Sequence, residues 1–300
     1  MLLTYMEVKT MSNFVLSAFA DEIDMNLKMQ MDILEKHDIH YIEMRGVNGK
    51  GIVDYSLEEV KEIKKALDER DFKISSIGSP IGKILITDDF KPHLELFKHT
   101  LSIAKILETK YIRMFSFFMP PAEAPEKYRD EVMLRWTEFV KAATGYEIIL
   151  LHENEKDIYG DTPERCLDIL QTMNCDYVKA VFDPANFVQC NVKTYPHAFT
   201  LLKDYIVYMH IKDAVYSDHH VVPAGLGDGK VREILNYLHH INYDGFLSLE
   251  PHLGLFEGLK NLELDNNNKQ VTQSGTSLFN IATTALKDIL SKINEGGENS

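Results

Sequence analysis

Four side chains able to bind a metal ion each end a short apolar run in the second half of the chain. The runs are IILLHE ending at Glu153, VKAVFD at Asp183, IVYMH at His210 and FLSLE at Glu250. The intervals of 30, 27 and 40 residues (183−153, 210−183, 250−210) each accommodate one strand, one helix and two loops. Because the strands of a closed β/α barrel all point the same way, groups at their carboxyl ends converge on one rim. We therefore expect the four side chains to meet at a single site.

Two glutamates, an aspartate and a histidine form a donor set dominated by oxygen. Such a set suits Mn²⁺, Mg²⁺ or Zn²⁺ and leaves coordination positions open for substrate oxygens. We predict one divalent metal ion, with Mn²⁺ as the first choice and Mg²⁺, Zn²⁺ or Co²⁺ as alternatives. Its ligands would be Glu153, Asp183, His210 and Glu250.

A bound divalent ion can chelate a carbonyl and a neighbouring hydroxyl oxygen and acidify the adjacent C–H bond. A carboxylate on one face of the substrate can remove that proton, and a second on the opposite face can return it, which inverts the stereocentre or moves the carbonyl. We assign this acid/base role to Glu153 and Glu250, and a purely ligating role to Asp183 and His210. The chemistry predicts an isomerase or epimerase of carbohydrate metabolism, acting on a sugar or sugar phosphate.

A charged pair occupies the strand expected at 41–46. Ile42 and Met44 alternate there with Glu43 and Arg45. Since successive side chains of a barrel strand face opposite ways, the apolar pair would pack on the helices and the charged pair would point inward. This makes Glu43 and Arg45 candidates for binding substrate.

Further candidates lie at the ends of other expected strands. Lys83, in a loop rich in proline and glycine, binds an anion or is a solvated loop charge; Lys212 binds substrate or forms a salt bridge at the rim. The glycine-rich loop at 225–229 precedes a helix whose amino end favours anions, although it is also a plain turn. The predicted substrate-binding residues are Glu43, Arg45, Lys83, Asn186, Lys212 and His252.

Eight apolar runs alternate with stretches of helical periodicity, which favours a parallel sheet with crossover helices. Eight units suggest closure into a (β/α)8 TIM barrel, of the α/β class, within one domain over residues 1–300. The barrel is expected over about 14–253, followed by a C-terminal extension at 254–292 with an exposed loop and a last helix from 276. The expected strands lie at 14–20, 41–46, 72–78, 111–117, 147–154, 177–186, 206–213 and 246–253.

Composition narrows the class of protein. The formal net charge of −14 repels a polyanion, so we expect no nucleic-acid partner. No run approaches the roughly 18 apolar residues of a membrane span, and the first residues do not resemble a signal peptide. Three sparse cysteines form neither a disulfide framework nor a thiolate zinc site. We expect a cytoplasmic enzyme with a small-molecule partner and no membrane partner. The sequence is compatible with a monomer or with a homo-oligomer.

The residues between about 14 and 253 resemble the sugar phosphate isomerase/epimerase family of xylose isomerase-like TIM barrels, which also contains AP endonuclease family 2. The most specific pieces are SAFADEI at 17–23, LLHENEKDIYGDTPERC at 150–166, FDPANF at 182–187, HIKDA at 210–214 and LSLEPHL at 247–253. The resemblance implies the same metal quartet and the same two-glutamate acid/base pair.

Two departures bear on the substrate. Ketose epimerases carry a histidine three residues after the metal aspartate and an arginine six after the metal histidine, where this chain has Asn186 and Tyr216. These differences weigh against a standard free-ketohexose activity. Endonuclease IV enzymes need extra histidines for three zinc ions, and none lies near Gly78 or at 115–118.

The alternative functions can be ranked by how well each fits the four predicted metal ligands. A metal-dependent lyase, of the keto-inositol dehydratase type, would use the same quartet and follows the isomerase or epimerase. An AP endonuclease ranks below the lyase, because the extra zinc ligands of such enzymes are missing from this sequence. A non-catalytic sugar-binding barrel also ranks below it, because such a protein would not need an intact metal quartet.

Overall fold

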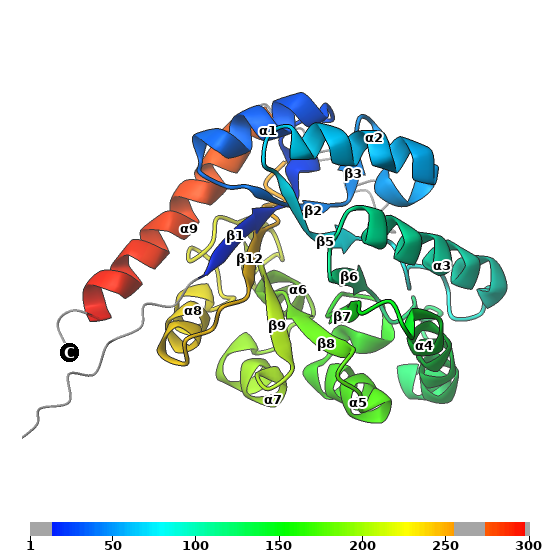
Figure 1. Ribbon diagram of the computed structural model, residues 1–300. Helices are drawn as coiled ribbons and strands as arrows, with labels where there is room; N and C mark the ends of the chain where they lie inside the picture. The colour runs from blue at the N-terminus through cyan, green and yellow to red at the C-terminus, as the bar shows by residue number, and fades with distance from the viewer. Residues whose placement is uncertain (1–13, 255–273, 298–300) are drawn as a thin grey trace, which may run out of the picture.

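Eight parallel strands close into a barrel at the centre of the molecule (Figure 1). The computed structural model describes residues 14–254 and 274–297. The strand order around the barrel is β1-β12-β9-β8-β7-β6-β5-β2, and β2 pairs with β1 to close it. The strands are β1 (Val15–Ala18), β2 (Tyr41–Met44), β5 (Lys73–Gly78), β6 (Tyr111–Met114), β7 (Ile149–Glu153), β8 (Val178–Phe182), β9 (Ile206–Ile211) and β12 (Phe246–Leu249). The predicted TIM barrel is confirmed.

Helices surround the barrel as an outer layer (Figure 1). They are α1 (Leu27–Lys36), α2 (Leu57–Asp68), α3 (Phe90–Ile106), α4 (Arg129–Ala143), α5 (Pro163–Met173), α7 (Phe199–Leu202), α8 (Val231–His240) and α9 (Gly275–Gly297). The short helix α6 (Pro184–Gln189) lies inside this ring, at the rim of the barrel (Figure 1). Short hairpins β3 (Gly46–Val47) with β4 (Lys50–Gly51) and β10 (Asp213–Ala214) with β11 (Val221–Val222) stand on the rim, and brief helical turns include η1 (Ala20–Glu22) and η2 (Ile52–Asp54).

Local signals in the sequence fix several helix starts. Ser56 caps α2, and the Glu59 carboxylate accepts a hydrogen bond from the Ser56 backbone N–H, which completes a capping box. Thr162 caps α5 and Pro163 takes its first position, where a missing N–H costs nothing. These starts orient the helices that follow the site-bearing strands.

Several predicted strands extend too far at their carboxyl ends. The sixth strand ends at Phe182 instead of reaching residue 186, because Asp183 caps α6 and begins a helix. The last helix, expected from 276, begins at Gly275 and reaches Gly297. The exposed loop expected at 254–275 lies almost wholly outside the described residues.

The main core lies between the barrel and the helices, with a smaller cluster inside the barrel. Trp136 of α4, predicted to be core, is fully buried against Phe139 and His152. Inside the barrel, Leu151 packs with Val181 below the rim, while Leu150 belongs to the outer core. The alternation in β7 therefore leaves Glu153 facing the barrel axis.

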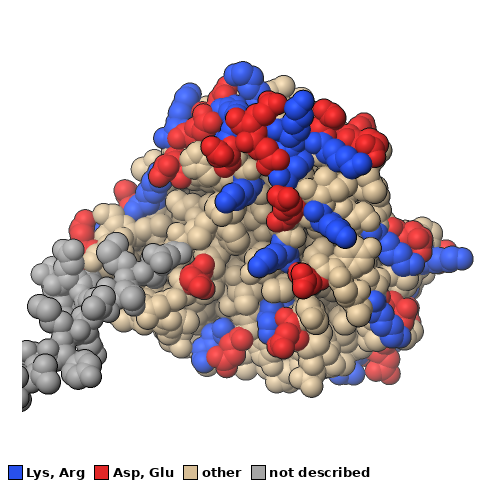
Figure 2. Space-filling view, viewed as in Figure 1, with Lys and Arg blue, Asp and Glu red and all other residues tan. Residues whose placement is uncertain are grey.

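On the face shown in Figure 2, positive and negative side chains lie next to one another over the outer helices. Among the described residues, Lys28 pairs with Asp32 on α1 and Lys64 with Asp68 on α2. Of the helices that the structure describes, none is both long enough and apolar enough to cross a bilayer. The face shown has no broad positive patch that would attract a polyanion.

Candidate metal centre

The four predicted metal ligands meet at one end of the barrel. Glu153 ends β7, Asp183 directly follows β8, His210 lies near the end of β9, and Glu250 directly follows β12. One donor atom of each lies within 4.8 Å of those of the others, and all four residues are buried. Since β7, β8, β9 and β12 are neighbours in the barrel, the quartet occupies one half of the rim.

His210 stands at the centre of the three carboxylates. Its Nδ1 lies 3.1 Å from Glu153 Oε1, 3.3 Å from Glu250 Oε2 and 3.8 Å from Asp183 Oδ2. Asp183 Oδ2 is buried and accepts no hydrogen bond from the described residues, although Lys212 Nζ is 2.9 Å away. Three convergent carboxylate oxygens and one imidazole nitrogen fit a divalent ion of the hard or borderline kind.

Glu43 lies behind the imidazole of His210. Its two carboxylate oxygens are 3.2 and 3.3 Å from His210 Nε2, and both side chains are fully buried. A carboxylate that accepts from Nε2 leaves the lone pair of Nδ1 facing the quartet. The substrate-binding role of Glu43 stays a prediction, and its carboxylate lies in contact with His210 Nε2.

Two predicted cationic residues contact Glu250. Arg45 Nη1 lies 3.0 Å from Glu250 Oε1, and Arg45 also binds Asp21 and Glu22. Lys212 Nζ lies 3.2 Å from Glu250 Oε2 and bridges it to Asp183. Both cations therefore fix the carboxylate oxygens of the quartet.

Asn186 and His252 hold the two glutamates from their other sides. Asn186 Nδ2 donates to Glu153 Oε1 at 3.0 Å, and to the Asn154 carbonyl. His252 Nε2 lies 3.4 Å from Glu250 Oε1 and its backbone N–H donates to Glu22. Both predicted residues therefore belong to the site, in contact with Glu153 and Glu250.

Lys83 and the loop at 225–229 have partners of their own. Lys83 Nζ lies 3.1 Å from Glu155 Oε2 and over the ring of Phe115. The N–H groups of Gly225, Gly227 and Gly229 all donate to the carboxylate of Asp213, at 2.8–3.1 Å. The anion site expected in this loop is wrong, because a carboxylate of the chain itself occupies it.

Arg113 is a site residue that the sequence reasoning missed. It lies in β6, is buried, and its Nη1 donates to Glu153 Oε2 at 2.9 Å. The signal was present in the strand expected at 111–117, where a lone arginine between Ile112 and Met114 has the inward direction.

The surrounding charges keep both glutamates ionised. Burial raises the pKa of Glu153, but His210 and Arg113 outweigh it and lower that pKa to about 2. Burial also opposes ionisation of Glu250, yet Lys212 holds its pKa well below the usual value. For Asp183, burial dominates and raises the pKa. The cluster thus concentrates negative charge that a divalent cation would balance.

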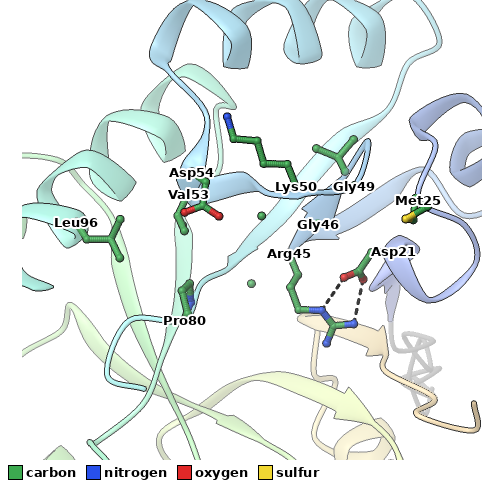
Figure 3. A pocket seen from close by; sticks show the side chains of 13 residues that line it. Asp21, Met25, Arg45, Gly46, Gly49, Lys50, Val53, Asp54, Pro80 and Leu96 are labelled. Carbon is green, nitrogen blue, oxygen red and sulfur yellow. Dashed lines mark hydrogen bonds and ion pairs between the residues drawn. The ribbon is translucent and has the colours of Figure 1, made fainter. Parts of the chain in front are cut away.

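A cavity of about 230 Å³ adjoins Arg45 between the β3–β4 hairpin and the segment after β5 (Figure 3). Asp21 and Arg45 form its inner end, and Pro80 and Leu96 form an apolar wall. Because the guanidinium of Arg45 also contacts Glu250, this side chain separates the cavity from the quartet. Space for a group of several atoms therefore lies one side chain away from the metal ligands.

A family model described as xylose isomerase-like TIM barrel matches residues 31–272. The chain belongs to this family. A search of curated protein sequences finds no match.

Solved structures share the fold over nearly the whole chain. A D-tagatose 3-epimerase-like protein has 18% identity and a TM-score of 0.71, covering 94% of this chain and 99% of its own. The IolI protein with a bound zinc atom has 20% identity and a TM-score of 0.70, covering 93% and 99%. The probable 3-DHS dehydratase AsbF from Bacillus anthracis has 16% identity and a TM-score of 0.68, covering 92% and 98%. At these identities the likeness shows the fold alone.

Proposed function

We propose that the chain is a divalent-metal-dependent isomerase or epimerase of a sugar or a sugar phosphate. The observation that carries the proposal is the buried convergence of Glu153, Asp183, His210 and Glu250 at one end of the barrel. Membership of the family supports it, as do an epimerase-like protein and a zinc-bound protein among the structures of the same fold. We propose Mn²⁺ as the ion, with Mg²⁺, Zn²⁺ or Co²⁺ as alternatives.

The quartet would hold the ion, whose chemistry when bound is to polarise a substrate carbonyl and acidify the neighbouring C–H bond. Glu153 and Glu250 stand at the two ends of the quartet, because β8 and β9 lie between β7 and β12 in the barrel. Two carboxylates on opposite sides of a substrate can take a proton from one face and give one to the other.

Each glutamate has one oxygen bound by an arginine. Arg113 binds Glu153 Oε2 and Arg45 binds Glu250 Oε1, so neither carboxylate can rotate freely. The other oxygens, Glu153 Oε1 and Glu250 Oε2, face His210 and the centre of the site, where the ion would be held. We propose that each glutamate accepts or returns the proton through the carboxylate oxygen that does not bind the ion.

Solvent deuterium tests the proposal. The Mn²⁺-loaded protein is incubated in D₂O with a panel of free and phosphorylated sugars, and exchange at carbon is followed by NMR. Glu153→Gln and Glu250→Gln should each lower the exchange rate by about two to four orders of magnitude, the usual contribution of a general base. The exposed Glu62→Gln on α2 is the control and should match the wild type. Rapid exchange in both active-site variants would contradict the acid/base assignment.

A lyase that expels water is the second candidate. It needs the same proton abstraction together with a proton donor for the leaving hydroxyl, and Lys212 lies 3.2 Å from Glu250 in a position to serve. A probable dehydratase shares the fold. Loss of water from a substrate in the same NMR experiment would identify this activity.

A further inference from the structure

The rim of the barrel divides into two halves of different chemistry. Strands β7, β8, β9 and β12 carry the quartet, and the other four strands face it. Phe19 follows β1, Arg45 follows β2, Gly78 ends β5 and Arg113 lies near the end of β6. These four residues therefore lie across the rim from the quartet.

Arg45 is largely taken up by carboxylates of the chain. Its Nε and Nη2 donate to Asp21, Nη2 also lies 3.3 Å from Glu22, and Nη1 binds Glu250. Figure 3 shows the two bonds that join it to Asp21. This side chain therefore fixes the wall of the site.

Arg113 has a different set of contacts. Its side chain is 2% exposed, and Nη1 is bound to Glu153 Oε2. Within residues 14–254 and 274–297, no atom accepts a hydrogen bond from Nε or Nη2 of Arg113. These two nitrogens share one edge of the planar guanidinium, so their N–H bonds form a fork that suits a pair of neighbouring oxygens.

The neighbours of Arg113 hold the fork in place. Its guanidinium carbon lies 4.6 Å from the ring centre of Phe115 and 5.4 Å from that of Phe19. Phe19 in turn packs edge to face with His210, at 5.2 Å between ring centres. A Cβ at Gly78 would stand 2.7 Å from Phe19 Cε1 and 3.3 Å from Arg113 Nη2, so the glycine lets β5 pack closely against both side chains.

We propose that Arg113 is a substrate-binding residue, whose Nε and Nη2 receive two neighbouring oxygens of the molecule bound at the quartet. The oxygens belong to two adjacent hydroxyls of a sugar or to the carboxylate of a sugar acid. This inference rests on the proposed function. It assigns a binding residue to the part of the substrate that the quartet does not contact. Because the same guanidinium also holds Glu153, it fixes the distance between the substrate and the proposed base.

Arg113→Lys tests the role, because lysine keeps the charge and loses the fork. Arg135→Lys is the matched control, since Arg135 is another buried arginine packed over aromatic rings, in α4 and away from the site. For the full-length, Mn²⁺-loaded proteins, the readouts are KM and kcat for deuterium exchange and the Kd for Mn²⁺ by EPR.

We expect Arg113→Lys to raise KM about tenfold or more while the Kd for Mn²⁺ changes less than about threefold. A sugar that lacks one of the bound hydroxyls should bind the wild type more weakly than the complete sugar does. The same two sugars should bind Arg113→Lys with nearly equal affinity. A larger effect on sugar acids than on neutral sugars assigns the fork to a carboxylate; the reverse assigns it to hydroxyls. An unchanged KM, or a KM that rises only in step with the Kd for Mn²⁺, overturns the proposal.

A wild type that exchanges no sugar refutes the proposed function without deciding the role of Arg113. Calorimetric titration of sorbitol and of glucuronate into the Mn²⁺-loaded wild type and Arg113→Lys then decides it. Weaker binding of either probe to the variant supports the fork. Equal affinity for both probes, or binding of neither to the wild type, overturns it.

Discussion

At the scale of the residue, the contact between Glu43 and His210 makes a prediction about metal affinity. Glu43→Gln keeps an acceptor near His210 Nε2 but removes the negative charge that favours donation from that nitrogen. We expect the Kd for Mn²⁺, measured by EPR, to rise about 10- to 100-fold, the range found when such partners are removed. A Kd equal to that of the wild type would show that Glu43 does not orient the histidine.

Residues at strand ends could be located from the sequence, and their partners could not. Asp183 and His210 were found because each follows an apolar run, and the barrel then brings the runs together. Lys83 pairs with Glu155, and the loop at 225–229 donates hydrogen bonds to Asp213. The sequence does not show these pairs, because only the folded chain brings the partners together. Spacing gives the position along a strand, whereas pairing depends on neighbours distant in sequence.

At the scale of the element, His93 joins α3 to the loop that follows β5. Its Nε2 accepts the N–H of Gly82 at 2.7 Å, so it must be neutral, and burial with Arg135 nearby lowers its pKa to about 4. The unfolded chain binds this proton below about pH 6.5, so stability falls between there and about pH 4, by up to about 3 kcal/mol. Below pH 4 both states are protonated and this loss ends.

His93→Gln isolates this effect, because glutamine accepts the same hydrogen bond and does not titrate. We expect the variant to lose less unfolding free energy than the wild type between pH 6.5 and 4, measured by urea denaturation of the metal-free proteins. Parallel pH dependences for the two proteins would show that His93 does not carry the acid sensitivity.

Element boundaries followed from the sequence where a cap fixes them. The capping box of Ser56 and Glu59 set the start of α2 correctly. The sixth strand was drawn too long because Asp183 is followed by apolar residues, while its side chain caps α6 through the N–H of Asn186. A residue that ends one element and begins the next has no distinct pattern of its own.

At the scale of the whole molecule, α9 completes the outer layer beside α8 and near η1 (Figure 1). Leu286 in α9 is fully buried, whereas Ile281 is 43% exposed. We expect Leu286→Ala to lower the free energy of unfolding by about 2–5 kcal/mol, the range for a buried leucine. Ile281→Ala is the matched control, with an expected change within about 0.5 kcal/mol. Equal losses in urea denaturation of the two variants would mean that α9 does not pack as described.

The pairing of β1 with β12 also has a consequence for biosynthesis. Val15 stands opposite Phe246 and Ala18 opposite Leu249, so this edge of β1 has no partner until β12 has been made. Until then β1 and β9, the two neighbours of β12, each present an unpaired edge, which is a template for wrong association. Glu250 follows that final strand directly. Nascent chains released before it should therefore have an open barrel and lack the fourth ligand of the quartet.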